Sequence, residues 1–222
     1  MEIKENLKSD KRKMLIYLLI TLLNTIEYLW INSIFPGSII SRLVFLTMIS
    51  LFVNWFYYSI RFLYHLDLKL IHEIKERRIF KFGFSLSFLV VIMYWGMIIA
   101  DPQTLLKAEN RIPIVLDLLL HGCNFFLNLL EHLIINRKVN DSDKLIGWKF
   151  FFIFSVVYTV EIKFVSYYFN FHAYPIVQFM NFPLMIFLNV VAMLIMLIGE
   201  FIYNNISMMG MKKLLIEGEN VK

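Results

Sequence analysis

The sequence predicts an all-α membrane protein: a single domain that forms a polytopic bundle of six transmembrane helices. Two observations predict this fold class. Of the 222 residues, 59% are hydrophobic and only 18% are charged, and the apolar residues gather in six long stretches. A soluble domain of this size cannot bury so much apolar surface. Lipid is therefore the expected solvent for most of the chain.

Each apolar stretch is long enough to cross a bilayer as a helix, because a hydrocarbon core of about 30 Å needs about 20 helical residues. The first stretch follows a basic segment at Lys11–Lys13 but has no small-residue cleavage site, so we interpret it as a retained span. Helix-ending residues such as Pro36-Gly37 and Asn140-Asp141 separate the stretches. Within the single domain 1–222, the predicted spans are about 14–35, 39–63, 79–100, 113–136, 148–169 and 183–204.

The distribution of Lys and Arg predicts the orientation of the bundle, because short cytoplasmic loops collect positive charge. Six spans place both termini on one side, and most of the 22 basic residues lie on that side. The opposite side holds only Arg42, Lys107 and Arg111, while Lys163 lies within the fifth span. We therefore expect both termini to be cytoplasmic.

Several classes of partner and cofactor are disfavoured by the composition. The net charge is +5, but the basic residues do not form a stripe interleaved with aromatic residues, so no nucleic-acid partner is expected. A single cysteine, Cys123, excludes an internal disulfide and a cysteine-built metal cluster. Zinc needs about three converging ligands, and His121 is the one histidine predicted at depth in the membrane. The sequence therefore predicts neither a metal nor a cofactor.

Polar side chains recur at steps of three and four residues in three of the spans, which places each set on one helix face. In a membrane, such Ser, Thr and Asn residues commonly join helices, and this is the alternative reading for Asn24, Asn54 and Asn128. An embedded histidine or carboxylate more often marks a site. The three sets are Tyr17, Thr21, Asn24 and Tyr28; Thr47, Ser50, Asn54, Tyr57 and Arg61; and Asp117, His121, Asn124, Asn128 and Glu131.

Two reactive side chains are expected at matching depths. Thr47 and His121 each lie eight residues beyond the predicted outer ends of their spans, Ile39 and Pro113. At 1.5 Å per residue, both would be about 12 Å below those ends. Neighbouring second and fourth helices would then bring the hydroxyl and the imidazole within hydrogen-bonding reach.

This pairing indicates nucleophilic catalysis. A threonine hydroxyl becomes a useful nucleophile when a nearby base removes its proton, and a neutral imidazole can do so near pH 7. Asp117, one turn before His121, is a candidate for orienting the ring, as the third member of a triad does. Asn124, Asn24 and Ser50 are further candidates for the substrate pocket.

A series of short motifs is similar to those of the androgen-induced transmembrane protein family. Its members hydrolyse fatty acid esters of hydroxy fatty acids, and the resemblance covers nearly all six spans. It implies an intramembrane threonine hydrolase with Thr47 as nucleophile and His121 as general base and acid. The matching motifs are Phe45-Leu46-Thr47-Met48-Ile49, Trp95 with Asp101, Ile112-Pro113, His121 with Glu131, Tyr174-Pro175, Gly199-Glu200 and Asn204-Asn205.

The chain departs from the family pattern in two places. Where the family often has Asn-His-Gly-x before the catalytic histidine, this chain has residues 117–120, Asp-Leu-Leu-Leu; and Pro102-Gln103 replaces an Arg-Glu pair. The resemblance implies a lipid ester as substrate and a multi-pass protein of the endomembrane system, such as the endoplasmic reticulum, or of the plasma membrane. The alternative is a non-enzymatic carrier, channel or scaffold whose polar stripes are structural.

Overall fold

The structure is a computed structural model, and it is all-α. It describes residues 2–34, 45–66, 73–100, 113–135, 148–169 and 181–219. The segments between these ranges lie outside the described residues. They include the predicted outer charges Arg42, Lys107 and Arg111, as well as the Tyr174-Pro175 motif. The prediction of an all-α fold is confirmed.

Four helices are long and apolar enough to cross a membrane. They are α1 (Glu2–Ile34), α4 (Glu73–Ala100), α8 (Trp148–Phe169) and α10 (Phe182–Glu219). Their apolar portions are Lys11–Ile34, Arg78–Ile99, Trp148–Phe169 and Phe182–Ile206. The chain is therefore an integral multi-pass membrane protein, and four of the six predicted spans are supported by length and composition.

The second predicted span is occupied by a shorter helix, α3 (Leu46–Tyr64). Residues 39–44 of that predicted span lie outside the described residues, and Phe45, just before the helix, has an extended backbone, with φ −92° and ψ 122°. Its buried face carries Ser50, Asn54 and two tyrosines. These polar groups face other helices, so α3 is an inner helix of the bundle.

The fourth predicted span is not one regular helix. It consists of α6 (Ile114–Leu118), a π-helical turn η2 (Leu119–Cys123) and α7 (Asn124–Ile135), which follow one another directly. A π-helix is rare, and most examples are single turns inserted in α-helices, often at functional sites. The turn changes which faces of α6 and α7 point into the bundle.

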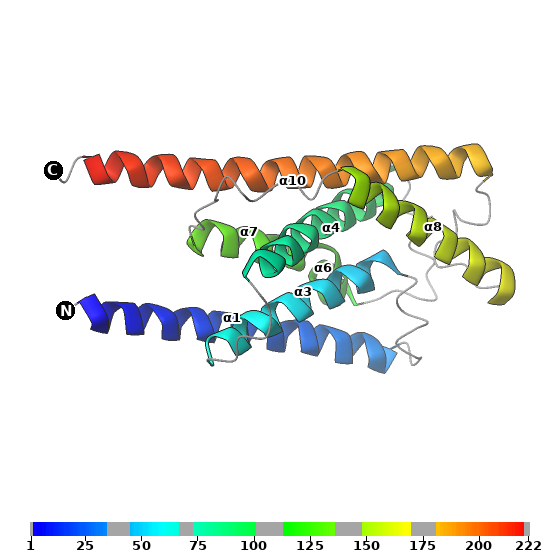
Figure 1. The fold of residues 1–222 in the computed structure, drawn as a ribbon. Helices are drawn as coiled ribbons and strands as arrows, with labels where there is room; N and C mark the ends of the chain where they lie inside the picture. Colours follow the sequence, from blue (N-terminus) through cyan, green and yellow to red (C-terminus); the bar gives the residue numbers. More distant parts are fainter. Residues whose placement is uncertain are drawn as a thin grey trace.

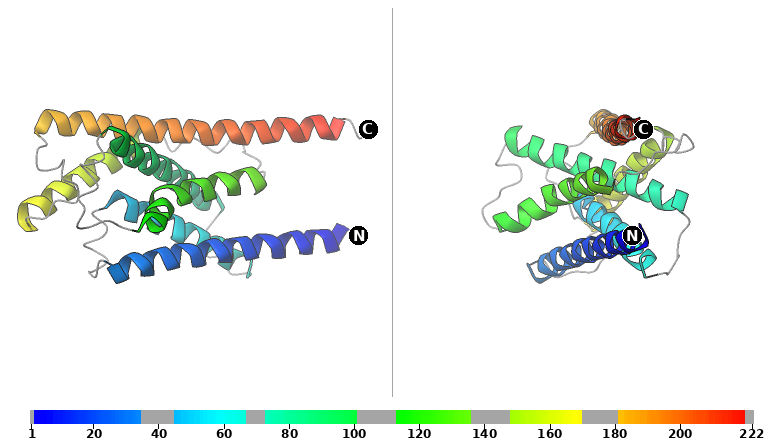
Figure 2. Two further views of the ribbon diagram at one scale, coloured as in Figure 1. Left: turned by 180° about the vertical axis from the view of Figure 1, so that it is seen from behind. Right: turned by 90° about the vertical axis from the view of Figure 1, so that its left-hand side faces the viewer.

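The two longest helices, α1 and α10, lie on opposite sides of the molecule with the other helices between them (Figures 1 and 2). Helix α1 packs on α3, α3 on α4, α4 on α10, and α10 on α8, while η2 and α7 contact α4. The start of α1 and the end of α10 lie at the same end of the molecule (Figure 1). This end is the one that the charge distribution predicts to be cytoplasmic.

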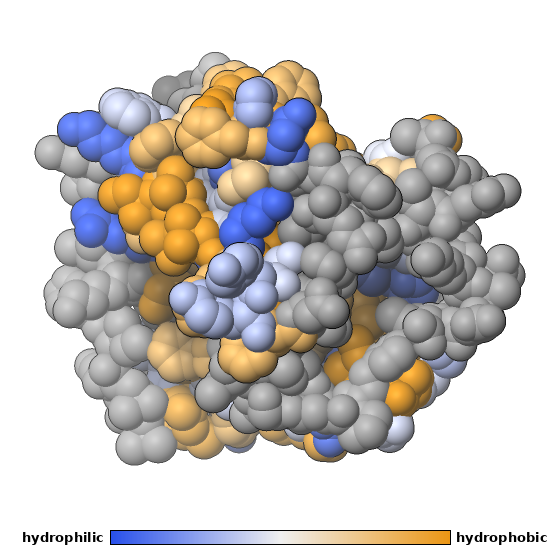
Figure 3. Space-filling model, turned by 90° about the vertical axis from the view of Figure 1, so that its right-hand side faces the viewer, coloured by the Kyte–Doolittle hydropathy of each residue, from blue (hydrophilic) through white to orange (hydrophobic). Residues whose placement is uncertain are grey.

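Large apolar side chains are exposed along the outer faces of the long helices, as expected where lipid is the solvent. Examples are Leu19 and Leu29 on α1, Val160 on α8, and Phe187 and Phe201 on α10. At the end of the molecule where α10 begins, hydrophilic and apolar side chains lie beside one another (Figure 3). The apolar flanks and the mixed end fit a bundle whose sides face hydrocarbon.

A buried network of polar side chains joins α3, α4 and α7. The amide of Asn128 donates to Asn54 Oδ1 at 2.9 Å, and Asn128 Oδ1 accepts from the Tyr58 hydroxyl at 2.6 Å. Asn54 in turn donates to Ser87 Oγ at 2.8 Å, and the Ser87 and Ser50 hydroxyls are 3.1 Å apart. Because every amide here has a partner, this network serves helix association, which is the structural reading of Asn54 and Asn128.

Candidate functional site

His121 lies in the middle of the π-helical turn. The residue is buried, with 8% of its surface exposed, between Leu120 and Gly122, which are also buried. The sequence Leu-Leu-His-Gly-Cys in this turn contains a glycine, and a Cβ at Gly122 would meet no atom within 4 Å. There is therefore open space next to the histidine on the same turn.

Asp117 holds the imidazole of His121 from within the same helical segment. The ring nitrogen Nδ1 is 3.0 Å from the carboxylate Oδ1 of Asp117 and 3.1 Å from the backbone carbonyl oxygen of the same residue. A carbonyl oxygen can only accept a hydrogen bond, so Nδ1 must carry the proton in this arrangement. In the neutral ring, Nε2 is then the free base.

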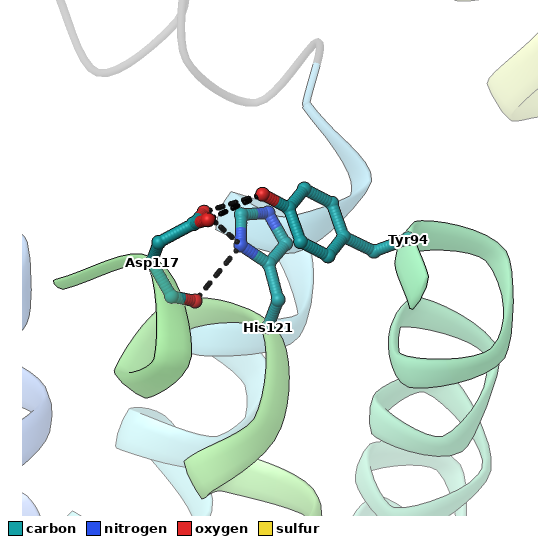
Figure 4. A network of polar contacts seen from close by, with 3 residues as sticks. All are labelled: Tyr94, Asp117 and His121. Carbon is teal, nitrogen blue, oxygen red and sulfur yellow. Dashed lines mark hydrogen bonds and ion pairs between the residues drawn. The ribbon is translucent and has the colours of Figure 1, made fainter. Parts of the chain in front are cut away.

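Tyr94, near the end of α4, completes the cluster (Figure 4). Its ring stacks on the His121 imidazole with the centroids 3.5 Å apart and the planes 7° apart. Its hydroxyl donates to both carboxylate oxygens of Asp117 at 2.6 Å. Tyr94 was not among the predicted site residues, because a tyrosine in an apolar span carries no motif and its partners lie on another helix.

Thr47 is the second residue of α3 and is half-buried. The residue after it, Met48, and Leu51 pack in one apolar cluster with Leu116 and Leu120 of the α6–η2 segment. The first turns of α3 therefore lie against the segment that carries His121. No hydrogen bond joins Thr47 to His121 in the described part of the chain.

The three other predicted pocket residues have different surroundings. Ser50 belongs to the polar network described above and is bonded to Ser87. Asn24 on α1 and Asn124, the first residue of α7, are buried, and within the described ranges neither polar atom of either amide has a hydrogen-bond partner. Of the predicted set, the structure thus brings Asp117 and His121 together by hydrogen bonds.

The fold and this cluster define a class: a multi-pass α-helical membrane protein with a part-buried cluster of Tyr94, Asp117 and His121. The chain belongs to the FAR-17a/AIG1-like protein family, whose model matches residues 12–207. The resemblance found in the sequence is thereby confirmed. A comparison with the curated proteins gave no match. A comparison with the solved structures gave none either.

Proposed function

We propose that the protein is an intramembrane hydrolase of lipid esters that uses Thr47 as nucleophile and His121 as general base and acid. One observation carries this proposal: the buried imidazole is held at Nδ1 by the carboxylate and carbonyl of Asp117, so that Nε2 is the basic nitrogen. Membership of the family supports it. The resemblance implies fatty acid esters of hydroxy fatty acids as the substrates.

In the first half of the proposed reaction, the Thr47 hydroxyl oxygen attacks the carbonyl carbon of the ester. His121 Nε2 takes the hydroxyl proton, and the Asp117 carboxylate stabilises the imidazolium that forms. When the tetrahedral intermediate collapses, the bond to the alcohol oxygen breaks and the imidazolium gives its proton to that oxygen. The alcohol leaves, and the acyl group remains on Thr47 as an ester.

In the second half, water attacks the carbonyl carbon of the threonyl ester while Nε2 takes a proton from the water. The bond to the Thr47 oxygen then breaks, and the proton passes from the imidazolium to that oxygen. The fatty acid is released and both side chains return to their starting states. No cofactor is required by this sequence of steps.

A lipid substrate fits the location of the site. The cluster lies within a bundle whose outer faces expose large apolar side chains, so the acyl chains of a lipid substrate would dissolve in the hydrocarbon that surrounds the site. Burying each methylene of such a chain contributes roughly 0.8 kcal/mol. We further propose that α3 and the α6–η2–α7 segment complete six spans, with both termini in the cytoplasm, in the endomembrane system or the plasma membrane.

The test is hydrolysis by protein purified in detergent. Wild type, Thr47→Ala and His121→Ala are offered an ester of a hydroxy fatty acid beside an ordinary triglyceride, and the released acid is measured. We expect hydrolysis of the first ester by wild type and none by either variant at equal yield of folded protein. A fluorophosphonate probe should label wild type but not Thr47→Ala, and equal labelling of both would contradict the assignment of the nucleophile.

The second candidate function is a non-enzymatic carrier, channel or scaffold. The hydrogen-bonded network around Asn54 and Asn128 favours this second function, because its amides are paired with other helices and so serve to hold the helices together. Transport of a lipid or an ion that is unchanged in both Thr47→Ala and His121→Ala would support this function against the hydrolase.

A further inference from the structure

A second buried cluster of polar side chains lies near His121, and its hydrogen-bonding atoms are unpaired. Asn24 and Glu27 on α1 are fully buried, and Asn124 on α7 is 4% exposed. Among the residues that the structure describes, neither amide nitrogen, neither amide oxygen and neither carboxyl oxygen has a hydrogen-bond partner. Buried polar groups are nearly always paired, so an unpaired set needs an explanation.

Other buried amide and carboxyl side chains in the bundle do form hydrogen bonds. Asn54 and Asn128 are equally buried, but each is joined to partners on other helices. The buried carboxyl of Glu131 accepts hydrogen bonds from the hydroxyls of Tyr17 and Tyr57. The fold thus provides partners for other buried amides and carboxyls, while Asn24, Glu27 and Asn124 are left without them.

The three side chains belong to one site. Asn24 and Glu27 are three residues apart on α1 and share a face of that helix. The carboxyl of Glu27 lies near the Asn124 amide and near the thiol of Cys123, but neither of its oxygens makes a hydrogen bond of good geometry with the described residues. We call these three residues, Asn24, Glu27 and Asn124, the polar site.

The polar site lies close to the level of His121 in the membrane. Asn124 follows His121 by three residues, which is about one turn and a rise of about 4.5 Å. Helix α1 runs antiparallel to α7, because Tyr17 contacts Glu131 while Glu27 lies beside Asn124. Asn24, one turn before Glu27, is therefore also near the Asn124 level.

We propose that the polar site binds the hydroxyl group of a long-chain hydroxy lipid, the alcohol half of the ester that the protein hydrolyses. A hydroxyl donates one hydrogen bond and accepts others. It can therefore donate to the Glu27 carboxyl while it accepts from the amide groups of Asn24 and Asn124. The identification of this hydroxyl as that of the alcohol product rests on the proposed function. The binding of a hydroxyl group at the polar site does not depend on that function.

Other ligands match the site less well. A free carboxylate would bring a second negative charge beside a buried carboxyl, which is unfavourable at low dielectric. A metal or ammonium cation would satisfy the oxygen atoms but not the amide hydrogens of the two asparagines. A group that is both donor and acceptor uses all three side chains.

Cys123 provides the experiment, because it is the single cysteine of the chain and interacts with Glu27. The rate of its alkylation by N-ethylmaleimide is measured by mass spectrometry on the full-length protein in detergent. The probes are a long-chain secondary alcohol with its hydroxyl at mid-chain, and the methyl ether of the same alcohol. We expect the alcohol to slow alkylation about tenfold at a concentration of about ten times its dissociation constant, and the ether to have no such effect.

Two variants and a matched control locate the effect. Glu27→Gln and Asn24→Leu should each abolish protection by the alcohol, where protection is the ratio of the alkylation rates of the same variant without and with the alcohol. Glu161→Gln, a carboxyl on α8 away from α1 and α7, should keep protection. Thermal unfolding in the same detergent shows that the variants are folded.

Each outcome is decisive. Equal protection by alcohol and ether, or protection that survives in Glu27→Gln, would overturn the proposal. Protection by sodium chloride but not by choline chloride would replace the hydroxyl with a cation as the ligand and also overturn it. If the alcohol protects Cys123 but the protein hydrolyses no ester, the hydroxyl site is supported and the proposed function is contradicted. If the protein hydrolyses the ester but the alcohol does not protect Cys123, the proposed function stands and the hydroxyl site is contradicted.

Discussion

The aromatic ring of Tyr94 lies flat against the imidazole of His121, with the centroids 3.5 Å apart, while its hydroxyl bonds to Asp117. One side chain of α4 thus contacts both members of the Asp117–His121 pair. Because the Tyr94 ring covers one face of the imidazole, the imidazole of His121 cannot rotate about its Cβ–Cγ bond without breaking this stacking contact. Tyr94 is therefore a positioning residue in the proposed reaction.

Replacing Tyr94 with Phe removes the hydroxyl and keeps the ring. The Asp117 carboxylate then loses a donor at 2.6 Å, and we expect kcat for ester hydrolysis to fall about tenfold, with little change in KM. Tyr94→Leu removes the ring as well and should have a larger effect. A rise in KM without a change in kcat for Tyr94→Phe would indicate contact with substrate instead.

Asp117→Asn tests the tautomer of His121. An asparagine presents a donor as well as an acceptor to Nδ1, so it no longer favours the proton on that nitrogen. By analogy with the Asp to Asn change in a serine protease triad, kcat should fall by roughly 10²- to 10⁴-fold. Thermal unfolding in detergent serves as the control. An active Asp117→Asn variant would show that the carboxylate has no part in catalysis.

Asn124→Leu and Asn128→Leu form a matched pair one turn apart on α7. Asn128 bonds to Tyr58 and Asn54, so its replacement leaves buried groups unpaired and should destabilise the protein by about 1–3 kcal/mol. Asn124 has no hydrogen-bond partner, so its replacement should leave stability unchanged or raise it. Thermal unfolding of both variants in the same detergent measures the difference. Equal destabilisation by both would mean that Asn124 has a structural role.

Gly83 and Gly96, both on α4, form a second matched pair. A Cβ at Gly83 would lie 2.9 Å from Asn54 Oδ1, which accepts from Asn128, whereas a Cβ at Gly96 would meet nothing within 4 Å. We expect Gly83→Ala to lower the unfolding temperature by displacing Asn54. Gly96→Ala should raise stability by up to about 1 kcal/mol through helix propensity alone. The reverse order would contradict the close packing of α3 on α4.

Much of the fold could be predicted from hydropathy, because apolar length is a local property of the sequence. The predicted span 148–169 coincides with α8; α4 and α10 contain the spans 79–100 and 183–204, and α1 contains all but the last residue of the span 14–35. The helices extend further at their charged ends, where hydropathy falls but helix geometry continues. The outer end of the second predicted span, residues 39–44, lies outside the described residues and stays a prediction.

The candidate site was predictable only in part. The spacing of Asp117 and His121 on one helix face is visible in the sequence, and the structure joins them. Tyr94 and Glu27 reach this region from other helices, so their roles depend on packing that no local pattern encodes. The π-helical turn was also missed, since five residues that include Gly122 do not differ in composition from an α-helical segment.

The proposed base and its orienting carboxylate lie within five consecutive residues, whereas the proposed nucleophile is carried by α3. The apolar contact of Met48 and Leu51 with Leu116 and Leu120 helps to set how α3 is seated beside that segment, together with the hydrogen bonds that join α3 to α7. In the proposed reaction, changes in these four apolar side chains would move Thr47 relative to His121 and so change the bulk of the lipids accepted, while Asp117 and His121 keep their spacing within one helical segment.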